Sequence, residues 1–382
     1  MAQPGPSPRG RFADTQPATV ALPSRAVSLA RRLLALSLAL IACQTVGPQS
    51  MKYGRGQYNQ TVQRTDAEQL LLNLVRLRYR DPPLFLEVTS IATSLSLELG
   101  TGVSGNAGGI NTVTPSGSVL YTERPTITYA PLHGSRFGQL FMTPIEPRVL
   151  LLLYHSGWAI DRILKVFVQR IGPLPNAPRA SGPTPDNAPQ YEDFFRACEI
   201  LRNLWRDGHL EFGETRRGDV PVLVIHIDPS RAEDPQVAEL ARVLGLPQPT
   251  TTLLFGATLR SNDPSLVPLV TRSLLAAMYY ASQGVDPPEL DLRRGKVTRT
   301  QGADGAAFDW TRVTGKIMRV HHADRRPSDA FVAVSYRGRW WYIDDTDLDS
   351  KSTFSFLSQT VELLSTDVRT SAPVMTLPIS AG

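Results

Sequence analysis

The stretch LFLEVTSIATSLSLELGTG, residues 84–102, decides the fold class because apolar residues alternate along it with polar or small ones. The alternation is clearest from Leu95 to Leu99. A second stretch of the same character, TVTPSGSVLYTERPTITY at residues 112–129, follows after a connection rich in Gly and Asn. Period two is typical of β-strands. The sequence therefore predicts a β-hairpin over residues 84–131.

The predicted hairpin carries no charged residue between Leu99 and Thr122. One interpretation is a hairpin that inserts in a membrane or joins a multi-subunit barrel, because membrane strands are about ten alternating residues long. An edge hairpin of an ordinary sheet produces the same pattern, and this second interpretation is favoured.

A helix is predicted immediately before the hairpin. Thr65 and Glu68 have the spacing of a capping box at a helix start, and Pro82-Pro83 are expected to stop the helix. The polar face of this helix, which we interpret as solvated, carries Gln69, Asn73, Arg76 and Arg80.

Further helices and a linker are predicted after the hairpin. Residues 146–172 combine apolar periodicity with charged interruptions, which is typical of a core helix and not of a membrane span. Residues 172–190 hold six prolines without apolar periodicity and predict a linker or an exposed loop. Residues 265–282 predict another helix, and a closing helix is expected from about Lys351 to Ser365.

Strands and helices alternate irregularly along the chain, without regular βαβ units. The predicted fold class is therefore α+β, with mixed antiparallel strands and helices. We expect two subdomains, residues 65–171 and residues 191–382, on either side of the proline-rich segment. A chain of 382 residues is long enough for both to bury a core.

The N-terminal region contains a short apolar run that ends at a cysteine. In residues 33–42 only Ser37 is polar, Arg31-Arg32 precede the run, and Cys43 follows it. A helix of about ten residues cannot cross a hydrocarbon core of about 30 Å. A basic flank followed by a short apolar run is typical of a secretory signal peptide.

Leu40-Ile41-Ala42-Cys43 resembles the lipobox of bacterial lipoproteins. The resemblance implies that residues 1–42 are a signal peptide with an over-long n-region, and that acylated Cys43 inserts its chains into the lipid bilayer. Residues 43–64 are then a polar tether. Gln44, which is not Asp, implies sorting to the outer membrane, with the chain on its periplasmic face. No named family is identified for the globular part.

The length of the segment before the apolar run leaves the translation start open. Met1, Val27 and Met51 are the alternatives, and only a start at Met51 removes the lipoprotein signal. We expect the signal to be present. The other interpretation of Cys43, a core cysteine on a buried hydrophobic helix, is not favoured, because Pro48 and the polar run after it supply nothing to pack against.

The charge of the chain argues against a nucleic-acid partner. The formal net charge is +5, but residues 1–42 contain five of the 40 basic residues and one of the 35 acidic residues. The remainder has a net charge of about +1, which leaves no excess with which to neutralise phosphates.

Asp345, Asp347 and Asp349 form a weak candidate metal site, because they stand two apart as in the first half of an EF-hand loop. Ser350 and Phe356 stand where that loop needs Gly and Glu, so no metal is assigned. We prefer a turn in which Asp349 or Ser350 caps the closing helix.

No catalytic residue or cofactor is assigned. The sequence contains no serine elbow, Walker loop or Rossmann fingerprint. The second thiol, Cys198, lies on an apolar helical stripe and is interpreted as a buried hydrophobe.

Two functions from different classes remain. The first is a membrane-anchored cell-envelope lipoprotein that acts as a non-enzymatic structural or assembly component. It binds envelope proteins, with the hairpin as the expected contact, and the sequence leaves open whether it forms oligomers. The second is a periplasm-facing hydrolase or glycan-binding protein that uses Asp345, Asp347 or Asp349. The first is preferred because no set of acid, base and nucleophile can be assembled.

Overall fold

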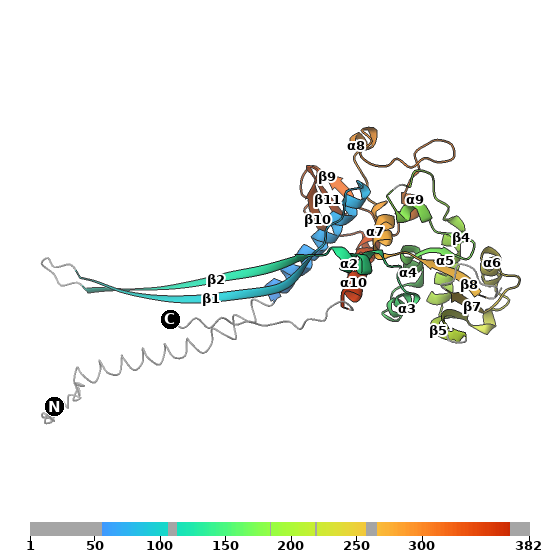
Figure 1. Cartoon of the computed structure of the whole chain (residues 1–382), viewed down its shortest axis with the longest axis horizontal. Helices are drawn as coiled ribbons and strands as arrows, with labels where there is room; N and C mark the ends of the chain where they lie inside the picture. Colours follow the sequence, from blue (N-terminus) through green and yellow to red (C-terminus); the bar gives the residue numbers. More distant parts are fainter. Residues whose placement is uncertain (1–55, 106–112, 184, 218–219, 257–265, 367–382) are drawn as a thin grey trace, which may run out of the picture. The chain divides into compact units, whose positions relative to one another are not determined.

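The computed structural model describes residues 56–105, 113–183, 185–217, 220–256 and 266–366 (Figure 1). The chain divides into two units, Met1–Gln63 and Arg64–Gly382. The predicted signal peptide, residues 1–42, and the predicted lipidation site Cys43 lie outside the described residues.

The fold class is α+β, as predicted. Among the described residues the strands form three sheets. The largest has the order β4 (Leu174–Pro175), β3 (Val168–Ile171), β8 (Leu266–Thr271), β7 (Thr252–Gly256), β6 (Val220–Ile227) and β5 (Leu210–Arg217). Its neighbouring strands are antiparallel except for the parallel pair of β7 and β8. The other two sheets are β10 (Ala330–Tyr336), β11 (Arg339–Asp344) and β9 (His321–Ala323), and the pair β1 (Leu86–Gly105) and β2 (Val113–Pro131).

Helices pack on the largest sheet and on one another. Helix α5 (Glu192–Arg206) contacts β4 and β5 and lies between α4 (Ile160–Phe167) and α6 (Pro235–Val243), while α4 also contacts α3 (Pro147–His155) and α7 (Leu274–Ser282). The last described element is helix α10 (Leu348–Thr366). The shorter helices are α2 (Gly134–Phe137), α8 (Glu289–Arg293), α9 (Thr311–Thr314), the π-helix η1 (Gly138–Met142) and the 3₁₀-helices η2 (Pro178–Ser181) and η3 (Pro229–Arg231). Buried apolar side chains from Leu70 to Leu357 form one cluster, so these elements share a core.

The helix before the hairpin occupies residues 56–78. Thr65 is therefore inside the helix, and the predicted capping box is wrong. Glu68 instead forms an ion pair with Arg64, one turn earlier, with 3.0 Å between Nε and Oε1. Residues 56–64, the last part of the predicted polar tether, are helical.

Two predicted helices contain strands. Residues 146–172 form α3, α4 and β3, because Gly157 at φ 90° ends the first helical segment. Residues 265–282 form β8 and α7. The break comes at Ser273, whose hydroxyl accepts a hydrogen bond from the Ala276 amide (3.1 Å) and so caps α7.

The proline-rich segment 172–190 is a packed loop. Leu174, Ala177 and Ala180 are buried in it. β3, which precedes the segment, pairs with β8, which follows it. Other residues of the segment are exposed, among them Pro173, Pro178 and Pro183, so the loop is buried only in part. One sheet contains strands from both sides of the segment.

A buried arginine, Arg272, joins this loop to α4 and β3. Its side chain is 1% exposed, and all three guanidinium nitrogens donate hydrogen bonds. The acceptors are the carbonyl oxygens of Lys165, Val166, Val168 and Asn176 and the hydroxyl of Ser181. The guanidinium also lies 4.0 Å from the centre of the Tyr280 ring.

Candidate functional site

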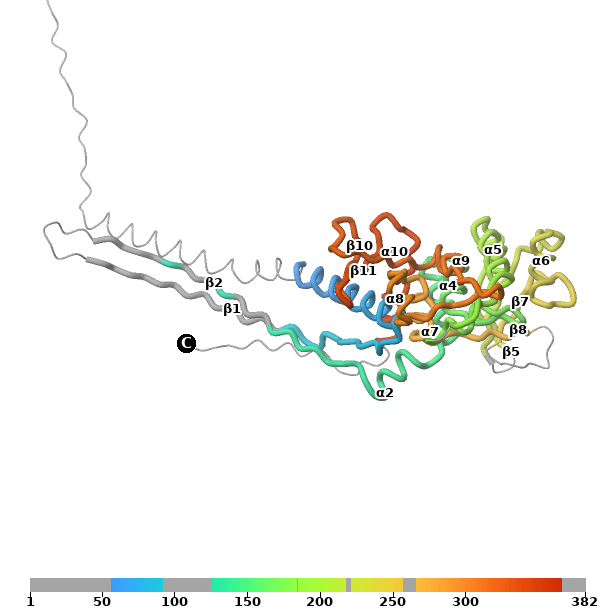
Figure 2. Tube along the Cα trace, turned by 90° about the horizontal axis from the view of Figure 1, so that it is seen from above, coloured from blue at the N-terminus to red at the C-terminus, as the bar shows by residue number. Residues whose placement is uncertain are grey.

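The hairpin is a two-stranded antiparallel sheet, whose register runs from Leu86 opposite Pro131 to Gly105 opposite Val113. Figure 1 shows β1 and β2 side by side, and Figure 2 shows the same for the coloured part of the two strands at the base of the hairpin. Neither strand belongs to another sheet of the described chain. Each strand therefore has an outer edge that no other described strand covers.

One face of the hairpin is apolar near its base. Cross-strand partners share a face, and the register pairs Val88 with Tyr129 and Ile91 with Ile127. Ile91, Ile127 and Tyr129 are 38–50% exposed. The other face carries the pair Ser90 with Thr128.

A β-bulge keeps these apolar positions in phase. The register shifts between Val88 and Ser90, so Thr89 is the extra residue. Without this insertion, Ile91 would lie on the face opposite to Val88, because strand positions alternate. The Thr89 hydroxyl donates to the Thr128 carbonyl oxygen (3.1 Å) and fixes the bulge.

Two amide side chains clamp the base of the hairpin. The Asn73 amide nitrogen donates to the Leu84 carbonyl oxygen (2.8 Å), and Asn73 Oδ1 accepts from the Leu84 amide (3.0 Å). Gln69 makes the same reciprocal pair with Leu86, at 3.2 and 2.7 Å. The two side chains thus take the place of a neighbouring strand.

The interpretation of the polar helix face as solvated is wrong for Asn73. Gln69 and Arg76 are half-buried, and Arg80, which follows the helix end, is exposed. Asn73 is fully buried, the Arg76 guanidinium lies 5.9 Å from the centre of the Tyr336 ring, and Arg80 donates to the Thr298 hydroxyl (2.6 Å). The partners of these side chains are backbone atoms and residues far away in the chain, so the helix sequence alone does not indicate the contacts.

The three candidate aspartates have three different partners. Asp345 pairs with Lys351, Asp347 with Ser350, and Asp349 with Arg162. The Asp347 carboxylate accepts from the Ser350 amide (3.1 Å) and hydroxyl (2.7 Å), so it caps α10. A capping turn is present, but Asp347 is the cap and not Asp349 or Ser350, because α10 begins at Leu348. In the described ranges, no three His, Cys, Asp or Glu residues are grouped so that they could hold a metal ion.

Cys198 is fully buried, as expected for a small hydrophobe. Burial raises the pKa of the Cys198 thiol to about 12. The thiol is therefore protonated at neutral pH and is a poor nucleophile.

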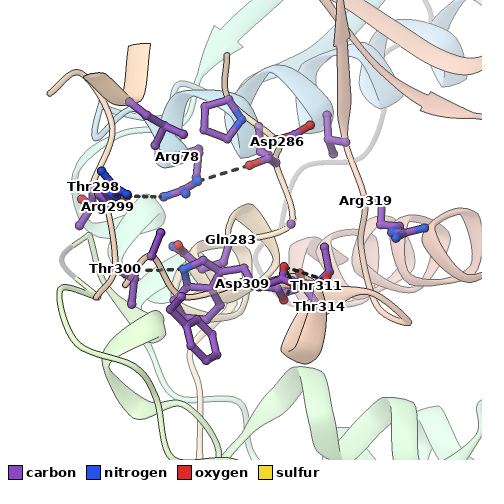
Figure 3. A pocket seen from close by; sticks show the side chains of 18 of the residues that line it. Arg78, Gln283, Asp286, Thr298, Arg299, Thr300, Asp309, Thr311, Thr314 and Arg319 are labelled. Carbon is purple, nitrogen blue, oxygen red and sulfur yellow. Dashed lines mark hydrogen bonds between the residues drawn. The ribbon is translucent and has the colours of Figure 1, made fainter. Parts of the chain in front are cut away.

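A cavity of about 380 Å³ lies between the end of the helix over residues 56–78, the connection from α7 to α8 and the segment that leads to α9 (Figure 3). Arg78, which is 7% exposed, lies between Thr298 and Asp286. Its Nε and Nη1 donate to the carbonyl oxygens of Val285 and Thr298, each at 3.4 Å. Burial lowers the pKa of Arg78 to about 10.

Gln283 also lines the cavity and is buried. Its amide nitrogen donates to the Tyr279 carbonyl oxygen (3.3 Å), but Oε1 has no partner in the described structure. On the same wall the Trp310 indole nitrogen donates to the Thr300 hydroxyl (3.0 Å), which in turn donates to the Pro185 carbonyl oxygen.

Sequence reasoning missed this cavity, because more than two hundred positions separate Arg78 from Gln283. One signal was present. Arg78 stands four residues after Leu74 and seven after Leu71, which are positions of the apolar helix stripe. A charged residue on the apolar stripe of a helix predicts a charged group that is buried in the fold.

No protein-family model, curated protein or solved structure matches this chain. A search of the described helices for one long and apolar enough to span a membrane found none.

Proposed function

We propose that this chain is a membrane-anchored cell-envelope lipoprotein that acts as a non-enzymatic structural or assembly component and binds protein partners. The observation that carries the proposal is the exposed apolar face of the β1–β2 hairpin, with Ile91, Ile127 and Tyr129 as its members. Soluble proteins rarely leave contiguous apolar surface uncovered unless it meets a partner.

The strand edges support the same proposal. A two-stranded hairpin is marginally stable by itself in water. No other described strand covers its outer edges, so a strand of another protein can add to them. The Gln69 and Asn73 amides hold the first residues of the hairpin, so a partner would meet a fixed base.

The anchoring part of the proposal is supported by the sequence around Cys43. A single acyl chain gives only marginal membrane binding, whereas the several chains of an acylated lipoprotein cysteine give stable attachment. We propose attachment to the outer membrane on its periplasmic face. Partners are then other envelope proteins.

The alternative, a hydrolase or glycan-binding protein built on the three aspartates, has less support. Each carboxylate has a partner of its own, and Asp347 is occupied in capping α10. General acid-base catalysis needs groups that converge on one substrate position.

Intact mass and membrane fractionation test the anchor. We expect a mature chain that begins at acylated Cys43 and sediments with outer membranes, and a Cys43→Ser chain that does not. A wild-type chain that is soluble and unacylated would overturn the lipoprotein proposal.

Cross-linking in intact cells tests the binding surface. A double variant Ile127→Ser, Tyr129→Ser disrupts the apolar face, and Thr126→Ser, Thr128→Ser is the matched change on the opposite face. We expect the first to remove specific cross-linked partners, identified by mass spectrometry, and the second to keep them. Equal partner yields from both variants would contradict the assignment of this face.

A further inference from the structure

The cavity beside α8 contains a buried cation that its surroundings satisfy only in part. Arg78 makes two hydrogen bonds at 3.4 Å, the long end of the range, and no ion pair with a described residue. A guanidinium has five N–H donors. Part of the donor capacity of Arg78 is therefore free for a ligand.

The acidic residues around the cavity are largely occupied or exposed to water. Asp309 accepts from the amide (2.9 Å) and the hydroxyl (2.7 Å) of Thr311. Glu289 forms an ion pair with Arg293 (3.5 Å), and Asp286 is exposed.

Two more arginines, Arg299 and Arg319, line the rim of the cavity, are exposed, and have no ion-pair partner in the described ranges. Asp286 acts on Arg78 through its charge but forms no ion pair with it in the described structure. The lining thus has three arginines and two aspartates without an ion pair among the described residues, so the remaining charge is positive and favours an anionic ligand.

The side chain of Gln283 indicates that the ligand also carries a hydrogen-bond donor. Gln283 Oε1 is a buried acceptor without a partner among the described residues. A buried acceptor left without a hydrogen bond is unfavourable by roughly 1–3 kcal/mol. A ligand hydroxyl or amino group would satisfy this atom, whereas a fully ionised carboxylate or phosphate has no donor to offer.

We propose that this cavity binds a small carboxylate ligand that carries a hydroxyl or amino group near its carboxylate. The guanidinium of Arg78 binds the carboxylate, and Gln283 Oε1 accepts from the neighbouring donor. A volume of about 380 Å³ suits a ligand no larger than a sugar acid or a short peptide. A sugar acid and a short peptide both offer a carboxylate with a hydrogen-bond donor near it. The proposal does not rest on the function proposed for the hairpin.

Calorimetric titration of the detergent-solubilised full chain tests the proposal. The probes are glucuronic acid with glucose as its neutral counterpart, and alanyl-alanine with alanyl-alaninamide. We expect saturable binding of at least one acid and none of its counterpart without a carboxylate, and the acid that binds shows whether the ligand is a sugar acid or a peptide. Binding of neither acid, or equal binding of a counterpart without a carboxylate, would overturn the proposal.

Variants assign the binding to this cavity. Arg78→Gln and Gln283→Leu should each weaken binding of the acid by at least about tenfold. Arg294→Gln, an exposed arginine of the same region that does not line the cavity, should leave binding unchanged. If Arg78→Gln does not fold, Gln283→Leu and the rim variant Arg299→Gln decide, and unchanged affinity in both rejects the site.

Discussion

Arg272 and Arg78 are both buried guanidiniums without a carboxylate partner in the described chain, and burial lowers the pKa of each to about 10. Arg272 donates from all three nitrogens, mostly at about 3 Å, and stacks on Tyr280. Arg78 donates from two nitrogens at 3.4 Å and faces a cavity. Both arginines are thus buried and have a lowered pKa. They differ in the number and distance of their hydrogen-bond acceptors, which leave Arg272 saturated and Arg78 with donors for a ligand.

The largest effect is expected where the donors are saturated. Arg272→Met should lower the free energy of unfolding by at least about 4 kcal/mol, because five acceptors lose a donor together. The carbonyls of Lys165 and Val168 keep the side-chain amide nitrogen of Asn176 as a second donor, whereas no second donor among the described residues replaces the bond to the carbonyl of Asn176 itself. Urea unfolding of the full chain measures this. Arg272→Lys should recover part of the loss, since an ammonium has three donors. A loss below about 1 kcal/mol for Arg272→Met would break the comparison.

The base of the hairpin offers a second saturated polar group. Asn73→Ala should lower the free energy of unfolding by about 2–3 kcal/mol, because the Leu84 amide and carbonyl lose their partners. Hydrogen exchange of the Leu84 amide reports the local effect. Gln69→Ala, at an exposed pair, should have a smaller effect of about 1 kcal/mol. Equal effects of the two changes would mean that burial does not decide the strength of the clamp.

The carboxylate of Asp291, in helix α8, makes the stability of the fold depend on pH. Asp291 accepts from Lys296 Nζ (2.8 Å) and from the Tyr79 hydroxyl (2.8 Å), and these bonds hold the pKa of Asp291 below its ordinary value of 3.8. The carboxylate therefore stabilises the fold above about pH 4, and this contribution is lost as the pH falls through the lowered pKa.

Asp291→Asn tests this coupling. We expect the variant to be less stable than wild type at pH 7, and the difference to shrink below pH 4, when wild-type Asp291 becomes protonated. Thermal unfolding across this pH range measures both. A difference that stays constant down to pH 2 would show that Asp291 acts without its charge.

The sequence predicted those parts whose signal is local. The hairpin followed from period-two alternation, and the α+β class from the irregular order of elements. The bulge at Thr89 did not follow, because one extra residue changes the phase without changing composition. Nothing in the sequence indicated the partners of Asn73 and Gln69. These partners are the backbone amides and carbonyls of Leu84 and Leu86, and every residue type other than proline has both groups.

The cavity was beyond sequence reasoning for a related reason. Its two buried polar groups come from distant segments, and neither belongs to a motif. Leu71 and Leu74 placed Arg78 on a buried stripe, so its burial could be predicted. Whether its donors were saturated, as in Arg272, depended on carbonyl positions that only the fold defines.

The smallest expected effect on stability is also the sharpest test of the comparison. Gln283→Leu removes an acceptor that has no partner, at the cost of one 3.3 Å bond from its amide nitrogen to the Tyr279 carbonyl oxygen. Replacing an unsatisfied buried polar group by an apolar one of similar size is nearly neutral or stabilising. The free energy of unfolding should therefore change by less than about 1 kcal/mol, measured in the same urea titration as for Arg272→Met. A loss of about 3 kcal/mol would mean that Gln283 is as saturated as Arg272, and that the polar wall of the cavity is structural.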